Sequence, residues 1–193
     1  MQVEYEATYP NIDKDNIRQK LKNAGATLVR SEYLQKRVVF NLPAGLDIKG
    51  GWLRVRDEGN RITMSLKAVD GEHIESQKEL MLEVNSFENA EELLTLLGAR
   101  KKAYQETKRE LWELDGVEIT IDEWPFLKPF VEVEGNSEER VKRVSEKLGF
   151  HWKDALFCAV GTLYEMQYGI SEAAFNNDTP KIVFDMENPF IGK

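Results

Sequence analysis

The chain has 193 residues, of which 41% are hydrophobic and 31% are charged, so it can bury one compact core and is not intrinsically disordered. Its 34 acidic and 26 basic residues give a formal net charge of −8, which argues against a generally basic surface that binds nucleic acid. The single cysteine, Cys158, excludes an internal disulfide, and no apolar run is long enough to cross a membrane. Because the N-terminus is charged rather than apolar, we expect a cytoplasmic protein with neither nucleic-acid nor membrane partners.

Alternating and helical apolar spacings divide the chain into strands and amphipathic helices. In chain order they predict a strand at 3–8, a helix at 13–25, strands at 33–42, 53–56, 62–67 and 79–84, a helix at 86–98, strands at 104–114, 117–122 and 131–134, and helices at 137–149 and 154–169. The first three helices each begin at a capping residue and end at a glycine. We expect residues 1–170 to form one domain, and 171–193 to form a tail that is packed on it or flexible.

The eight predicted strands place apolar residues on one face and an excess of charge on the other. One interpretation is a half-buried antiparallel sheet whose polar face lies in water. The other is an α+β fold in which an eight-stranded antiparallel barrel closes around a charged lumen, with the helices packed outside. The excess of charge over Thr and Ser favours the barrel. The fourth helix is expected to pack on its outside, with covering of the tunnel as the alternative.

Strand parity places two sets of charges in this lumen. The acidic set is Glu4, Glu6, Glu79, Glu83, Glu118, Asp122, Glu132 and Glu134, and the basic set is Arg54, Arg56, Lys67 and Arg109. Crowded carboxylates need a counter-charge, and oxygen ligands without Cys or His select hard cations such as Mg²⁺ or Mn²⁺. Forked guanidinium donors match phosphate oxygens. Carboxylate-bound metal beside basic side chains favours a triphosphate ligand, and the chain has no glycine-rich phosphate loop.

Several short segments together resemble the CYTH, or triphosphate tunnel metalloenzyme, family. They are Glu4-Tyr5-Glu6, Trp52-Leu53-Arg54-Val55-Arg56, residues 63–67, Lys78-Glu79, residues 108–112, residues 117–122 and residues 130–135. Their order and spacing match over about residues 1 to 150. The family includes class IV adenylate cyclases, thiamine triphosphatases and inorganic triphosphatases.

The resemblance implies a role for each group of charges. Glu4 and Glu6, with Asp122, Glu132 and Glu134, would hold one or two Mg²⁺ or Mn²⁺ ions, and Glu79, Glu83 and Glu118 would be additional tunnel carboxylates. Arg54, Arg56, Lys67 and Arg109 would bind the triphosphate, and Glu4, Glu6 and Arg109 would be catalytic. The substrate would be a nucleoside triphosphate or another organic or inorganic triphosphate, and a homodimer is a further expectation.

The chain departs from the family pattern at positions that carry charge. Thr8 and Thr107 replace two family lysines, and Arg37 stands where an acidic residue is common. We hypothesise that Lys36 or Arg37 partly replaces the lost charge. Three functions remain open: an adenylate cyclase that forms cyclic AMP and pyrophosphate from ATP, a triphosphatase, and a module that binds nucleotide or polyphosphate without turnover.

Overall fold

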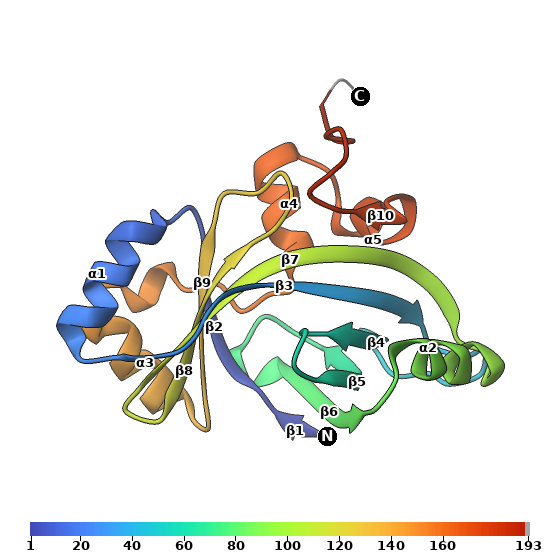
Figure 1. Ribbon diagram of the computed structural model, residues 1–193, viewed down its shortest axis with the longest axis horizontal. Helices are drawn as coiled ribbons and strands as arrows, with labels where there is room; N and C mark the ends of the chain where they lie inside the picture. The colour runs from blue at the N-terminus through green and yellow to red at the C-terminus, as the bar shows by residue number, and fades with distance from the viewer. Residues whose placement is uncertain (192–193) are drawn as a thin grey trace.

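The computed structural model describes residues 1–191, and Figure 1 shows a strongly curved sheet with helices around it. The strands are β1 (Gln2–Val3), β2 (Tyr5–Tyr9), β3 (Thr27–Asn41), β4 (Gly51–Asp57), β5 (Ile62–Val69), β6 (Gln77–Val84), β7 (Arg100–Leu114), β8 (Val117–Glu123), β9 (Phe130–Gly135) and β10 (Lys181–Ile182). The helices are α1 (Lys14–Ala24), α2 (Phe87–Leu96), α3 (Glu138–Lys147), α4 (Val160–Tyr168) and α5 (Glu172–Asp178), with short 3-10 turns at Ile74–Ser76 and Trp152–Asp154.

The N-terminal segment joins the two ends of the sheet. Hydrogen bonding gives the strand order β1-β6-β5-β4-β3-β7-β8-β9-β2, and β1 and β2 follow each other in the chain with only Glu4 between them. β1 pairs with β6 while β2 pairs with β9, both antiparallel. The sheet is therefore nearly closed into a barrel, which confirms the predicted fold class. The predicted N-terminal strand is split at Glu4.

Two strands of 15 residues, β3 and β7, run side by side through the centre of the sheet. Both strands begin earlier in the chain than predicted. The prediction missed residues 27–32 and 100–103 because they show no clear alternation of apolar and polar side chains. The register between β3 and β7 shifts at three places, including one between Val39 and Phe40. Such shifts change which side chains face inward.

Helices cover the outward apolar face of the sheet in two groups. Ile17 and Leu21 of α1 and Val141 and Val144 of α3 pack in one core with apolar residues of β2, β7, β8 and β9. Ala90 and Leu94 of α2 pack against the outer face of β3 and β4. The predicted capping residues Asp13, Ser86 and Ser137 each accept a hydrogen bond from a backbone N–H of the first turn. This packing leaves the polar face of the sheet on the inside.

The C-terminal segment differs from its prediction. The predicted helix at 154–169 begins only at Val160, because the backbone of Leu156 instead exchanges two hydrogen bonds with Thr8, of 2.9 and 3.0 Å. Residues 171–191 are folded: Phe175 of α5 and Ile182 of β10 are buried, and β10 pairs parallel with β7. The last two residues of the predicted tail, 192–193, lie outside the described residues.

No helix within residues 1–191 combines the length and apolar character that a bilayer crossing requires.

Candidate functional site

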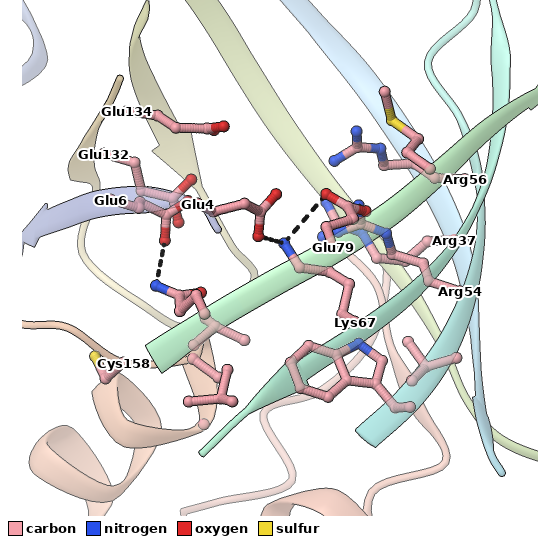
Figure 2. Close-up of a pocket in the computed structure, with 18 of the residues that line it drawn as sticks. Glu4, Glu6, Arg37, Arg54, Arg56, Lys67, Glu79, Glu132, Glu134 and Cys158 are labelled. Carbon is pink, nitrogen blue, oxygen red and sulfur yellow. Dashed lines mark hydrogen bonds and ion pairs between the residues drawn. The ribbon is translucent and has the colours of Figure 1, made fainter. Parts of the chain in front are cut away.

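A cavity of about 1730 Å³ lies inside the curved sheet. Figure 2 shows carboxylate groups on one side of it and guanidinium groups on the other. We call Glu6, Glu118, Glu132 and Glu134 the acidic wall, and Arg37, Arg54 and Arg56 the basic wall; all seven line the cavity. Glu4, Lys67 and Glu79 line the cavity too and lie between the two walls (Figure 2).

Strand register builds the acidic wall. Glu134 of β9 is the Cα partner of Glu6 in β2 and of Glu118 in β8, so the three side chains form one row on the inner face. In the adjacent row, Glu132 lies between two threonines, Thr8 and Thr120. The side-chain amide of Gln77 donates a hydrogen bond of 3.1 Å to Glu6. Three neighbouring strands thus bring together carboxylates that are far apart in sequence.

Burial and mutual repulsion perturb these carboxylates. Burial and the nearby charges of Glu6 and Glu118 raise the pKa of Glu134 to about 7. Burial, Glu6 and Asp122 raise the pKa of Glu132 well above its ordinary value. Both shifts have the direction expected when like charges share a site of low dielectric. The wall therefore holds protons, or attracts cations, at neutral pH.

Glu4, Lys67 and Glu79 form an ion cluster between the walls. Lys67 Nζ lies 2.8 Å from Glu4 and 3.5 Å from Glu79, and Arg54 donates a hydrogen bond of 2.9 Å to Glu79. Burial and the neighbouring Glu79 carboxyl raise the pKa of Glu4 to about 8. Burial acts in the same direction on Glu79, but contact with Glu4 and the charges of Arg54 and Lys67 lower its pKa. Of the two carboxyl groups, Glu4 is therefore the more easily protonated.

The basic wall contains buried donors that lack acceptors. Arg54 and Arg56 lie two residues apart on β4, and Arg37 is the Cα partner of Arg56 on β3. All three are at most 8% exposed. Their Nε atoms, and the hydroxyl of Thr63 opposite Arg56, have no hydrogen-bond partner among residues 1–191. Buried unpaired donors are costly, so this wall is suited to an anion with several oxygens.

Arg37 is the least compensated of these cations. Its Nη2 donates to Gln35 at 2.8 Å and to Thr107 at 2.5 Å, and both acceptors are neutral. Its guanidinium carbon lies 4.8 Å from the ring centre of Trp124. Burial, followed by the charges of neighbouring arginines, lowers the pKa of Arg37. Arg37 and Thr107, two positions at which the sequence departs from the family pattern that it resembles, therefore bond to each other.

Arg109 lies on β7, between the strands that carry the basic wall and those that carry the acidic wall. It donates to both oxygens of Asp122, at 2.7 and 2.8 Å, and to Glu132 at 2.6 Å. Thr120 also donates to Asp122, at 2.6 Å. Asp122 is fully buried, and it does not belong to the cavity-lining set. Its oxygens are engaged, so a cation could use Asp122 only by displacing these contacts.

Besides Asp122, two further predicted site residues lie away from the cavity. Lys36 is exposed on the outer face of β3, the same face on which Val38 packs under α2. Of the two candidates for the missing charge, only Arg37 reaches the cavity. Glu83 shares the parity of Glu79, but it lies near the end of β6, is exposed and does not line the cavity. Strand parity alone does not show where the lumen ends.

Six charged cavity residues were missed, namely Arg30, Glu58, Arg61, Glu72, Lys102 and Glu172. Glu58 is 3% exposed and lies 2.6 Å from Arg56, and its position two residues after Arg56 could have indicated it by parity. Lys102 lines the cavity from β7, and Glu172 lines it from α5. Parity assigns Lys102 to the outside, and nothing in the sequence connects α5 to the lumen. Residues 155–162 line the cavity as well, so the C-terminal segment is not confined to the outside of the barrel.

The acidic wall offers only carboxylate oxygens, which hard cations such as Mg²⁺ and Mn²⁺ prefer. Within residues 1–191, no three such side chains converge into a ready-made metal site. The chemistry nevertheless fits, because the raised pKa values of Glu132 and Glu134 report a local shortage of positive charge. The residues that would hold a cation are Glu6, Glu132 and Glu134, with Glu4 beside them.

The fold and the cavity together define a class of protein: an antiparallel barrel whose interior carries carboxylates on one side and arginines on the other. The family model for the CYTH domain matches residues 2–152, and the chain belongs to the CYTH family. The matched region ends before α4. No curated protein matches the chain.

Solved structures share this fold. A conserved hypothetical protein from Pyrococcus furiosus has a TM-score of 0.68 and 24% identity, covering 83% of this chain and 99% of its own. A candidate adenylate cyclase from Vibrio parahaemolyticus has a TM-score of 0.71 and 14% identity, covering 85% and 98%. A candidate adenylyl cyclase from Hippeastrum, described as having a dominant triphosphatase activity, has a TM-score of 0.59 and 16% identity, covering 88% and 96%. Two of these three neighbours are thus named as cyclase-like proteins, one of them with triphosphatase activity.

Proposed function

We propose that this protein is a metal-dependent enzyme that binds a triphosphate in the tunnel and converts ATP to cyclic AMP and pyrophosphate. The observation that supports it best is the basic wall, where each of three buried guanidinium groups has an Nε donor without a partner among residues 1–191 and faces a crowded carboxylate cluster. Membership of the CYTH family makes a triphosphate the expected ligand.

The basic wall would hold the phosphate oxygens. Arg37, Arg54 and Arg56 would donate to them, and Lys67 would leave its carboxylate partners to do the same. Arg109, already bonded to Asp122 and Glu132, would stabilise charge where the two walls meet. A divalent cation on the acidic wall would neutralise the phosphate charge and polarise the reacting P–O bond.

In the cyclase reaction the ribose 3′-oxygen forms a bond to the α-phosphorus, and the bond between that phosphorus and pyrophosphate breaks. The 3′-hydroxyl proton must leave, and the ionised form of Glu134, whose pKa of about 7 suits a general base, would accept it. The same clamp would serve a triphosphatase, in which water attacks the γ-phosphorus. The activity described for the Hippeastrum relative favours this as the second candidate.

Product analysis separates these candidates. The purified protein is incubated with ATP or tripolyphosphate and Mn²⁺, and cyclic AMP, pyrophosphate and orthophosphate are resolved. Cyclic AMP with pyrophosphate supports the cyclase, and orthophosphate without cyclic AMP supports the triphosphatase. Tight binding without turnover supports the binding module that Thr8 and Thr107 suggest.

Matched variants test the tunnel itself. Glu132→Gln and Arg54→Met should each abolish turnover, because they remove a charge from opposite walls. Glu83→Gln is the control, since Glu83 is exposed and does not line the cavity. Wild-type binding and turnover in both tunnel variants would show that the assignment is wrong.

A further inference from the structure

The C-terminal segment completes a wall of the cavity that the rest of the sheet leaves open. β8 pairs with β7 only as far as Lys108, whereas β7 begins at Arg100. Beyond that point β10 pairs with β7 at Tyr104 and Gln105. At the other side, Leu156 bonds to Thr8 at the edge of β2. The chain between these two contacts, α4 and α5 included, follows the region that the family model matches.

A bulge in β7 turns a lysine toward this wall. Val39 pairs with Ala103 and Phe40 pairs with Lys101, so Lys102 is an extra residue on β7. The bulge lets Lys101 reach outward to Glu91 of α2, at 2.6 Å, while its neighbour Lys102 lines the cavity. Lys102 forms no ion pair within 4 Å in the described part of the chain.

A carboxylate from α5 faces the same part of the cavity. Glu172 is the first residue of α5 and lies against Gly161 of α4, where a Cβ would be only 2.8 Å from Glu172 Cγ. The glycine therefore provides the space that Glu172 occupies. Both side chains line the cavity, and α5 packs against β7, the strand that carries Lys102, although no ion pair within 4 Å joins the two in the described part of the chain. Burial lowers the pKa of Lys102, and the Glu172 carboxylate acts in the opposite direction. Small and apolar groups, among them Ala159 and Ala173, line the cavity beside them.

We propose that Lys102 and Glu172 form a subsite for the base of a nucleoside triphosphate, and that this subsite prefers adenine to hypoxanthine. An ammonium beside a carboxylate matches a base edge on which a ring nitrogen accepts a hydrogen bond and the adjacent amino group donates one. Adenine has this edge, whereas hypoxanthine carries an oxygen in place of the amino group. Inorganic tripolyphosphate offers only acceptor oxygens, so it gains nothing from Glu172. The proposal rests on the proposed triphosphate site and names its substrate class.

Calorimetric binding of ATP, inosine triphosphate and tripolyphosphate with Mg²⁺ tests this subsite. The wild-type protein should bind ATP roughly five- to hundredfold more tightly than inosine triphosphate, as expected for two directed hydrogen bonds to a base. In Glu172→Met and Lys102→Met the preference should fall toward one, and tripolyphosphate affinity should not decrease in Glu172→Met. Glu165→Met and Lys101→Met, on exposed side chains of α4 and β7, are the matched controls and should keep the preference.

The outcomes separate the subsite from the proposed function. Equal binding of ATP and inosine triphosphate by the wild-type protein overturns the subsite without any variant. A preference that survives in folded Glu172→Met and Lys102→Met overturns the assignment to these residues. If the wild-type protein binds none of the three compounds, the proposed function is itself overturned.

Discussion

Arg37 offers the sharpest test of the basic wall. Its buried charge should lower the stability of the ligand-free protein but strengthen the binding of a triphosphate. Its guanidinium is 7% exposed, and its hydrogen-bond acceptors Gln35 and Thr107 are neutral. Replacing it by methionine keeps an unbranched side chain in the same space and removes the charge. The ligand-free protein and its complex should therefore respond in opposite directions.

The expected magnitudes follow from these contacts. An uncompensated buried charge costs several kcal/mol, and its removal forfeits two hydrogen bonds, although Gln35 and Thr107 still bond to each other at 3.2 Å. The net change in unfolding free energy of Arg37→Met should lie between zero and about 2 kcal/mol of stabilisation, which raises Tm by up to about 6 °C in a chain of this size. Loss of a charge-assisted contact, about 1.5–3 kcal/mol, should weaken tripolyphosphate binding roughly ten- to hundredfold.

Thermal melts without ligand and calorimetry with tripolyphosphate and Mg²⁺ measure the two effects. Lys36→Met is the matched control, because it removes the same charge from the exposed face of the same strand. The reasoning is refuted if Arg37→Met lowers the Tm of the free protein while it binds tripolyphosphate as tightly as wild type.

Three further changes probe the acidic wall, the Thr107 exchange and the C-terminal segment. Because the pKa of Glu134 is raised to about 7, its contribution to stability without metal should fall by up to about 3 kcal/mol as pH rises from 5 to 8, and Glu134→Gln should remove that part of the decline in chemical denaturation, leaving the part due to Glu4. Thr107→Lys should cost about 3 kcal/mol, because it buries a second cation against Arg37, and adding Arg37→Gln should recover part of that loss. Phe175→Ala should cost about 3–5 kcal/mol, whereas Asn177→Ala on the exposed face of α5 should change stability by less than about 0.5 kcal/mol.

Each of these changes has a result that would contradict it. Metal-free stability that is flat or rising between pH 5 and 8 would show that the carboxylates are not crowded. Additive effects in the Thr107→Lys, Arg37→Gln double variant would show that the two positions do not interact. Equal stability of Phe175→Ala and Asn177→Ala would show that α5 is not part of the folded core.

Strand parity predicted the barrel and most of its inward charges, because the outward positions of β2, β8 and β9 are consistently apolar under α1 and α3. Strand parity did not decide whether Lys36 or Arg37 faces inward, because the residues that follow them in the same strand, Val38-Val39-Phe40, are apolar on both faces. Packing decides the matter: Val38 and Phe40 lie under α2, so Arg37 and Val39 face the cavity.

Other features depend on contacts that a sequence pattern does not encode. The bulge that exposes Lys102 to the cavity is a property of the register between β3 and β7, not of either strand alone. The apolar spacing from Leu156 onward resembles a helix, but the free edge of β2 takes the backbone of Leu156 first. Glu172 reaches the lumen only because α5 folds back over α4, where Gly161 leaves room for it.

The order of strands in the sheet explains how a chain with a net charge of −8 builds a wall of arginines. β2, β9 and β8 are neighbours and supply the carboxylates, while β3 and β4 are neighbours and supply the arginines. β7 lies between the two groups, and its Arg109 bonds to Asp122 and Glu132 across that boundary. At the other boundary, where the N-terminal segment meets β6, Lys67 is held between Glu4 and Glu79. The strand order therefore places acidic and basic side chains on different parts of the barrel, which the net charge alone does not show. At each of the two boundaries between these parts, a cation, Arg109 or Lys67, is bonded to carboxylates.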